Sequence, residues 1–374
     1  MPERDRGYEV AVLGAGCVGA AVAYVLARRR LASVVVDASR PDTDIPWPAA
    51  VAVQGGSVPD VRLALRSAER LPGLQDAVGP FGYRRTGGLI VALTEAEADV
   101  HRGRVSEAQD AGLPVTWLSR EEALRREPGL SEGVLGARYC GYDGVVDGPA
   151  LMRRLLAAAG RFGAVAHVGC GYVMIGRGPD GFRIQAGRDE IIARRLVLAS
   201  GEMLRAVGRQ IGVDLPLRTG RRRMCVTERV GPLLRHTVNG IHQMPSGEAV
   251  LDPPVALEEG AGAADVSEVV ESLRRIATAS VRAVPALATA RILHAPLRVS
   301  LEPADGRPAV GRLEDRVHVA IAGPEQARTH FPIIADAIAE VLARDRQPED
   351  LETWAPDRFT AAELGAGVEG EDSC

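Results

Sequence analysis

The chain has 374 residues, of which 46% are hydrophobic and 25% charged, and its net charge is −4. The length suggests two domains, or one large domain with an inserted part, and the composition is ordinary for a soluble globular protein. The charge gives no reason to expect nucleic acid or an anionic membrane as a partner. No apolar run reaches the roughly 20 residues that a membrane span needs. The opening segment MPERDRGYEV lacks an apolar signal core, so we expect a cytoplasmic protein.

Two residue types narrow the chemistry. The five cysteines are scattered with no C-x-x-C pair, so we expect neither a disulfide framework nor a metal site. No lysine occurs, and all 45 basic residues are therefore arginine. This excludes a Schiff-base lysine, a P-loop lysine and a lysine that acts as a base or activates oxygen.

The start of the chain predicts a strand, a tight turn, a helix and a second strand. Residues 10–13 and 34–36 are apolar and rich in β-branched side chains, and the apolar residues 18–27 predict a helix. The turn before the helix contains glycines in the spacing G-x-G-x-x-G, namely Gly14, Gly16 and Gly19. This arrangement is typical of a dinucleotide site.

Each residue of this motif has a physical role. Gly14 permits a sharp turn, Gly16 leaves room for a diphosphate against backbone N–H groups, and Gly19 lets the helix pack closely on the strand. The N-terminus of the helix offers unpaired N–H donors and the positive end of its dipole to the phosphates. Asp37 ends the second strand, 18 residues after Gly19, where a carboxylate accepts hydrogen bonds from both ribose hydroxyls.

The rest of the chain alternates between helical and strand patterns. Ser119 and Glu122 form a capping box before a short helix, and Asp147 caps a longer one. From Pro216 the pattern changes to segments that predict antiparallel strands. The main further elements expected are helices at 58–69, 95–112 and 266–284, strands at 84–93, 113–118, 193–201 and 291–301, a hairpin at 172–185, and a last helix that starts at Pro332.

Several segments, taken in order, resemble one family. They are LPVTWLSREEALRREPGL, the helix VDGPALMRRLLAAA, the strand RRLVLASG, DGRPAVG near the C-terminus, and DRF at 357–359. With the N-terminal motif, they resemble the flavin-dependent D-amino-acid oxidase superfamily over residues 7–359, in its glycine oxidase and sarcosine oxidase branch. PLRTGRRRMCVTERV and AVAVQ are most similar to the β subunits of heteromeric dehydrogenases such as D-hydroxyproline dehydrogenase, opine oxidase and hydrogen cyanide synthase.

The resemblance implies an α/β fold with a discontinuous Rossmann-like FAD-binding domain and an inserted antiparallel-sheet α+β substrate domain. The first would comprise residues 1–80, 142–212 and 305–359, and the second residues 81–141 and 213–304, before a disordered tail at 360–374.

The implied cofactor is non-covalent FAD, and the implied reaction is hydride transfer from a C–H bond beside an amine onto flavin N5, which gives an imine. Such enzymes need little acid–base machinery, because the protein mainly orients the substrate carbon and holds its carboxylate. The cofactor's adenine half would lie on Gly14, Gly16, Gly19 and Asp37, with further contacts at Tyr172, Val173, Ala199 and Gly201.

Three residues are candidates near the reactive ring. Arg298 matches the family arginine that binds the substrate carboxylate with both ends of its guanidinium, and the alternative is an ordinary arginine at the edge of the core. His242 falls where glycine oxidase-like proteins carry a tyrosine, and it either contacts the carboxylate, accepts a proton or is structural. Gln54 resembles a glutamine that lies near the flavin in the β subunits.

The chain departs from the family pattern beside the expected flavin ring. Arg221, Arg222 and Arg223 stand where the β subunits have R-G-Q; the interpretations left open are an acidic substrate, a second flavin's phosphate, a site without catalysis, or a solvated basic turn. GPEQARTHFP at 323–332 replaces the loop G-H-x-x-x-G, which holds the flavin's pyrimidine edge, and lacks its inner glycine. Val51 stands where a glycine usually flanks the flavin.

The sequence therefore predicts an FAD-dependent oxidoreductase that oxidises the C–N bond of an amino acid, an imino acid or a related amine. The alternatives are a non-catalytic or electron-relaying subunit of a multi-subunit amine dehydrogenase and an NAD-dependent dehydrogenase. The expected partners are a small amino or imino acid and, through the resemblance, further subunits of a heteromeric dehydrogenase. Because no lysine can activate oxygen, we expect electrons to leave to another subunit or acceptor.

Overall fold

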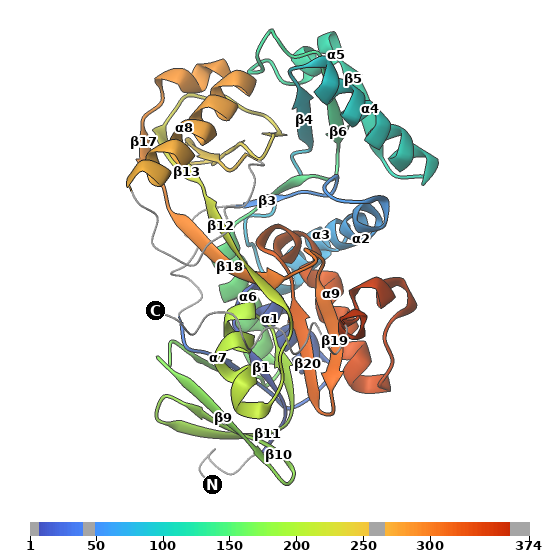
Figure 1. Ribbon diagram of the computed structural model, residues 1–374, viewed down its shortest axis with the longest axis vertical. Helices are drawn as coiled ribbons and strands as arrows, with labels where there is room; N and C mark the ends of the chain where they lie inside the picture. The colour runs from blue at the N-terminus through green and yellow to red at the C-terminus, as the bar shows by residue number, and fades with distance from the viewer. Residues whose placement is uncertain (1–6, 40–48, 254–265, 360–374) are drawn as a thin grey trace.

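The computed structural model describes residues 7–39, 49–253 and 266–359, and Figure 1 shows their arrangement. One half of the molecule holds an eight-stranded sheet with its helices, and the other holds two four-stranded sheets with theirs. The long strands β12 (Leu217–Arg223) and β18 (Leu297–Pro303) run between the two halves. The predicted disordered tail lies outside the described residues.

The eight-stranded sheet begins with the predicted strand–helix–strand unit. Strand β1 (Tyr8–Leu13) pairs in parallel with β2 (Ser33–Asp37) on one side and with β11 (Asp189–Leu198) on the other. The sheet order is β19-β20-β11-β1-β2-β8, with the hairpin β9–β10 joined to β11. The remaining bounds are β8 Val165–Val168, β9 Val173–Gly178, β10 Gly181–Ala186, β19 Ala309–Glu314 and β20 Val317–Ile321.

Both faces of this sheet are covered, which explains why its central strands are apolar throughout. On one face, α1 (Cys17–Arg28) packs against both α6 (Gly148–Arg161) and α9 (Pro324–Arg344), and the three helices share a core with one face of β1. On the other face, α7 (Gly201–Ile211) and the β9–β10 hairpin cover the alternate residues of β1. The glycine motif therefore opens beside a rigid, doubly covered sheet.

The second half holds the two four-stranded sheets, with orders β14-β4-β6-β5 and β15-β16-β13-β17. Helices α4 (Glu95–Asp110) and α5 (Arg120–Arg126) pack on the first sheet, and α8 (Val266–Ala283) packs on the second. The ladders β3–β7 and β12–β18 complete the strand pairing. The other bounds are α2 Val58–Ala68, α3 Leu71–Val78, β3 Ala49–Val51, β4 Gly88–Ala92, β5 Val115–Ser119, β6 Gly136–Cys140, β7 Gly144–Val146, β13 Cys225–Arg229, β14 Thr237–Val238, β15 His242–Gln243, β16 Glu248–Leu251 and β17 Ile292–His294.

The predicted helix caps are present. Ser119 Oγ accepts a hydrogen bond from the Glu122 N–H at 3.2 Å, and the Glu122 carboxylate accepts one from the Ser119 N–H at 2.8 Å. Asp147 Oδ1 accepts from the Ala150 N–H at 2.9 Å, at the start of α6. These contacts satisfy N–H groups that have no partner within the helix, so the local sequence alone fixes where both helices begin.

Two predicted elements differ from the structure. Residues 291–301 form two strands rather than one, because β17 pairs with β13 while β18 pairs with β12. Pro296 lies between them, and proline lacks the N–H group that a continuous ladder requires. The last helix begins at Pro324, after Gly323 as N-cap, and Pro332 lies in its interior. Burial of the apolar face of α9 outweighs the local cost of that proline.

Strands of the eight-stranded sheet come from all three segments assigned to the FAD-binding domain, and the two four-stranded sheets come from the segments assigned to the substrate domain. The domain boundaries themselves stay a prediction. Among the described residues, no helix combines the length and apolar character needed to cross a bilayer.

Candidate functional site

The glycine motif has the geometry that its spacing predicts. Gly14 has a φ of 109°, a conformation that favours glycine. A Cβ at Gly19 would lie 1.9 Å from the Gly14 carbonyl oxygen, so only glycine lets α1 approach the turn this closely. A Cβ at Gly16 would meet nothing within 4 Å. Gly14 therefore serves the conformation of the turn, Gly19 serves packing, and Gly16 faces open space that a ligand can occupy.

Asp37 lies beside this motif at the end of β2. Its Oδ2 accepts a hydrogen bond from the Ala15 N–H at 2.6 Å, and its Oδ1 accepts one from the Ser39 N–H at 2.9 Å. The Cys170 N–H donates to the Asp37 carbonyl at 3.3 Å, which brings the segment before β9 to the same edge. Tyr172 and Val173 follow directly in this segment, and the exposed Tyr172 donates its hydroxyl to the Gly187 carbonyl at 2.8 Å.

Ala199 and Gly201 lie on the other side of the motif, where Ala199 follows β11 and Gly201 is the first residue of α7. The Ala199 N–H donates to the Leu13 carbonyl at 2.8 Å, and its methyl group approaches Gly19. A Cβ at Gly201 would lie 2.2 Å from the Leu301 carbonyl oxygen of β18. Gly201 is therefore required where β18 crosses the start of α7, and its role as a cofactor contact stays a prediction.

Two adjoining cavities run along this region. The smaller, of about 180 Å³, is lined by Gly16, Cys17 and Asp37 together with the start of α6 and the first turns of α9. The larger, of about 430 Å³, lies among the loop after β3, the β12–β18 ladder and the same turns of α9. Pro324 and Arg328 line both cavities. Side by side, the two cavities fit an elongated ligand that carries phosphate beside Gly16.

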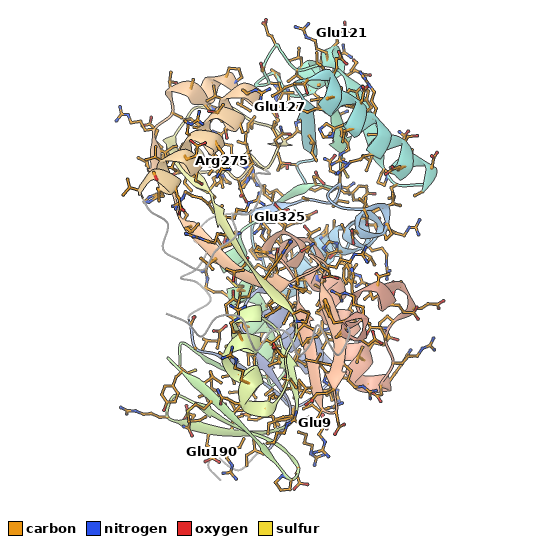
Figure 2. The ribbon with its side chains drawn as sticks, viewed as in Figure 1. Glu9, Glu121, Glu127, Glu190, Arg275 and Glu325 are labelled. Atoms are coloured by element: carbon orange, nitrogen blue, oxygen red, sulfur yellow. The ribbon has the colours of Figure 1, made fainter. Side chains whose placement is uncertain are left out.

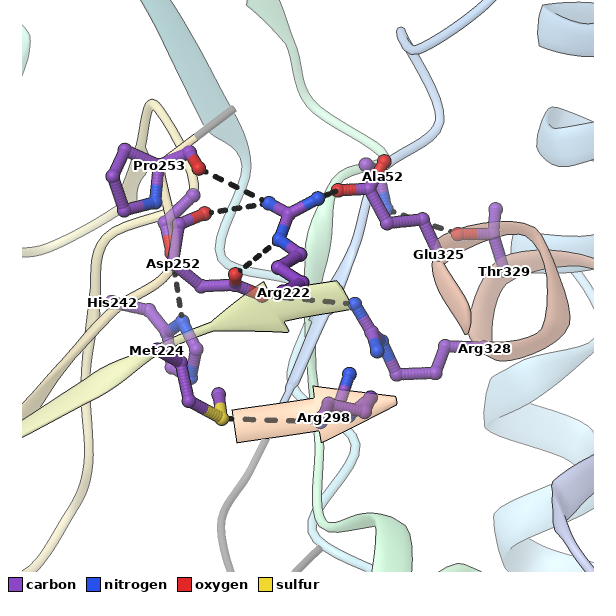
Figure 3. A network of polar contacts seen from close by, with 11 residues as sticks. Ala52, Arg222, Met224, His242, Asp252, Pro253, Arg298, Glu325, Arg328 and Thr329 are labelled. Carbon is purple, nitrogen blue, oxygen red and sulfur yellow. Dashed lines mark hydrogen bonds and ion pairs between the residues drawn. The ribbon is translucent and has the colours of Figure 1, made fainter. Parts of the chain in front are cut away.

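The β12–β18 ladder places Arg222 directly opposite Arg298 (Figure 3). Arg222 is partly buried and donates from Nε to Asp252 Oδ1 at 2.6 Å, and from another nitrogen to Glu325. Figure 2 shows Glu325 between the two halves of the molecule. Burial acts to lower the pKa of Arg222, but the charges of Asp252 and Glu325 outweigh it and raise that pKa. The interpretation of residues 221–223 as a solvated basic turn is therefore wrong, because they form part of strand β12, in which Arg221 is buried and Arg222 and Arg223 are partly buried.

Arg298 differs from its cross-strand neighbour because it has no carboxylate partner among the described residues. Its nearest polar contact runs from Nη2 to Met224 Sδ at 3.9 Å. Burial, aided by the Arg328 charge, lowers the pKa of Arg298 to about 10. Arg298 does not line either of the two cavities described, although Ser300, on the same strand, lines the larger one. Its charge is thus not neutralised by a paired carboxylate among the described residues.

His242 is buried on β15, where it pairs with Val250 of β16. Its Nδ1 lies 3.4 Å from the Gly240 carbonyl oxygen. Met224, the residue between β12 and β13, contacts Arg298 and so links this sheet to the β12–β18 ladder. The structure thus places His242 and Arg298 on neighbouring strand systems, and a catalytic role for His242 stays a prediction.

Gln54 is buried, and its side-chain amide is turned into the protein. Its Nε2 donates to Asp143 Oδ2 at 2.7 Å and to the Gly88 carbonyl at 3.0 Å, while Asp143 Oδ1 accepts from the Val53 N–H at 2.7 Å. Burial raises the pKa of Asp143 to about 6, against the lowering effect of these donors. The contacts fix the loop whose next residues, Gly55 and Gly56, line the larger cavity.

The segment predicted as an altered flavin loop forms the first turns of α9. A Cβ at its N-cap, Gly323, would lie 2.3 Å from Glu302 Oε2, and Glu302 is buried and paired with Arg218 Nη2 at 2.7 Å. Val51 is fully buried in β3.

The sequence marked this region as unusual but did not reveal the roles of Asp252, Glu302 and Asp143. No spacing pattern links these acids to their arginine or amide partners, which lie far away in the chain.

Comparisons with known proteins agree with this geometry. The model of the DAO family, described as FAD dependent oxidoreductase, matches residues 9–341. The chain is 27% identical over 379 residues to an opine oxidase subunit of Rhizobium meliloti, which covers 95% of this chain and 99% of that protein. It is 30% identical over 260 residues to glycine oxidase of Geobacillus kaustophilus, which covers 65% of this chain and 69% of that protein. The crystal structure of that glycine oxidase has a TM-score of 0.82 and 24% sequence identity, covers 94% of this chain and 99% of its own, and confirms the expected fold class.

Proposed function

Since this chain belongs to the DAO family of FAD-dependent oxidoreductases, we propose that it oxidises the C–N bond of an amino or imino acid to an imine. The family resemblance and the FAD cofactor expected from the sequence are confirmed, so the NAD-dependent interpretation is set aside. The non-catalytic or electron-relaying alternative is not favoured, because the relative that is 30% identical is named as an oxidase.

One observation carries the proposal: the two adjoining cavities lead from Gly16 and Asp37 to the ladder that holds Arg298. The bound FAD supplies the hydride acceptor. In this proposal Gly16 and the first turn of α1 receive the diphosphate, and Asp37 receives the ribose. Arg298 holds the substrate carboxylate through two parallel hydrogen bonds, because its guanidinium has no carboxylate among the described residues to neutralise it.

The substrate class is an amine that carries a carboxylate. Support comes from the uncompensated charge of Arg298 within the described residues and from the names of two similar proteins, the opine oxidase subunit and glycine oxidase. His242 is proposed to hydrogen-bond the substrate or accept its proton. We further propose that electrons pass to a partner subunit or another acceptor, since the chain has no lysine and one similar protein is named as a subunit. A cytoplasmic location belongs to this proposal as well.

The test is to purify the full chain, record its visible spectrum, and measure anaerobic flavin bleaching with a panel of amino and imino acids. Acid denaturation should release FAD, because the cofactor is expected to be non-covalent. A protein that binds FAD but is bleached by none of these acids, while it accepts electrons from another flavoprotein, would restore the relay interpretation.

Arg298→Gln should slow substrate-dependent flavin bleaching by about 10- to 100-fold and leave FAD content unchanged, because the variant loses charge-assisted hydrogen bonds to the carboxylate. Rapid-mixing spectrophotometry measures this rate. Arg291→Gln is the control, since Arg291 is highly exposed on the same segment. Full activity in Arg298→Gln would make Arg298 an ordinary arginine at the edge of the core.

A further inference from the structure

Arg328 is an arginine whose charge the described protein leaves largely uncompensated. It lies on the second turn of α9 and is only 6% exposed. Its Nε and Nη1 are buried and have no hydrogen-bond partner among the described residues. Its nearest carboxylate oxygen, Asp252 Oδ2, is 3.8 Å from Nη2, whereas Arg222 binds the same carboxylate at 2.6 Å (Figure 3). Buried donors without partners are costly, so this guanidinium is arranged for an anion that binds it.

The position of Arg328 identifies the part of the ligand that it faces. It lines both cavities, and in the smaller one it shares the wall with Gly16 and Cys17, at the first turn of α1. Burial raises the pKa of the Cys17 thiol, and the Arg328 charge is the largest influence that opposes this rise. Arg328 therefore lies close to the N-terminus of α1, the place where a dinucleotide diphosphate accepts backbone N–H hydrogen bonds.

We propose that Arg328 completes the diphosphate site of FAD from the side opposite the N-terminus of α1. Its Nε and Nη1 donate to phosphate oxygens, and the planar guanidinium suits this anion because two parallel hydrogen bonds can form at once. The arginine stands in the segment where the resembling family has its inner loop glycine, so the contact is a feature of this chain's own sequence. The inference rests on the proposed function only in requiring a dinucleotide.

The test compares ligands that contain one half of the cofactor. ADP carries the adenine and the diphosphate, and riboflavin carries the ring without phosphate. For the full-length apoprotein, isothermal titration calorimetry should show ADP binding at least about 10-fold weaker in Arg328→Gln than in wild type, while riboflavin binding, measured by fluorescence quenching, stays the same. Arg328→Lys should lie between the two, and its ADP affinity should fall more steeply with added salt than that of Arg328→Gln.

Arg298→Gln is the matched control, since it also removes an arginine that has no paired carboxylate among the described residues, and it should leave ADP affinity unchanged. Circular dichroism and the thermal midpoint check that each variant folds. The inference fails if Arg328→Gln binds ADP as well as wild type does, or if riboflavin binding weakens as much as ADP binding, which would place Arg328 at the ring. Either result leaves the proposed function intact, whereas a wild-type chain that binds no FAD would overturn the proposed function itself.

Discussion

The region of Gly14 to Asp37, which is proposed to bind the adenine half of FAD and is called here the adenine end, presents mainly backbone groups. The region of Arg222, proposed to face the flavin ring and called here the ring end, presents charged side chains from several distant elements. Around Gly14 to Asp37 the geometry comes from turn conformation and a helix N-terminus. Around Arg222, two strands, a loop and α9 contribute arginines and carboxylates that neutralise one another in part. The comparison teaches that residues close together in the sequence can form a cofactor-binding turn. The charges proposed to surround the reacting ring depend instead on ion pairs between residues far apart in the sequence.

The largest effect is expected at the ring end. Arg222→Gln should lower the free energy of unfolding by about 3 kcal/mol, because it leaves the buried Asp252 with only the distant Arg328 as counter-charge among the described residues. Urea unfolding measures this. Arg229→Gln, which breaks an exposed ion pair with Glu248, should leave the unfolding midpoint nearly unchanged. The double variant Arg222→Gln with Asp252→Asn should recover part of the lost stability. Equal unfolding midpoints for Arg222→Gln and Arg229→Gln would show that stability does not depend on the Arg222–Asp252 pair.

A pH effect follows from Asp143, which holds the loop at the larger cavity. Burial raises its pKa from 3.8 to about 6 in the folded state, so the native protein binds the proton at pH values where the unfolded chain has lost it. Asp143 therefore favours folding below about pH 4, and this contribution falls as the pH rises through about 6, by roughly 3 kcal/mol in all. Urea unfolding midpoints across pH 4–7 should show this decline in wild type and should lack it in Asp143→Asn. If the decline persists in Asp143→Asn, another group causes it.

Two glycine substitutions can separate packing from cofactor binding at the adenine end. Gly19→Ala should destabilise the protein by about 1–3 kcal/mol, because the new Cβ meets the Gly14 carbonyl. Gly16→Val should change stability by no more than about 0.5 kcal/mol, because that position faces open space, but it should abolish FAD binding. Thermal unfolding and flavin content measure the two effects. A destabilised Gly16→Val that still binds FAD would contradict the separation of packing from binding in this motif.

Much of the fold could be predicted because its signals are local. The helix caps, the strand–helix–strand unit and the hairpin before β11 depend on residues a few positions apart. The errors arose where tertiary contacts decided the outcome. Pro332 looks like a helix start, yet α9 begins eight residues earlier because Gly323 and Pro324 form the cap and the apolar face is buried beyond it. Pro296 divides one apolar pattern into two strands of different sheets.

The sequence by itself determined the dinucleotide motif, the family and the absence of lysine chemistry, since glycine spacing, segment order and composition need no neighbours to be recognised. Only the tertiary structure decided which arginines are neutralised. Arg222, Arg298 and Arg328 are the same residue type, but among the described residues Asp252 and Glu325 come from distant segments and pair closely with Arg222 alone of the three. Charge compensation depends on distance and burial in three dimensions, and neither can be read from positions along a chain.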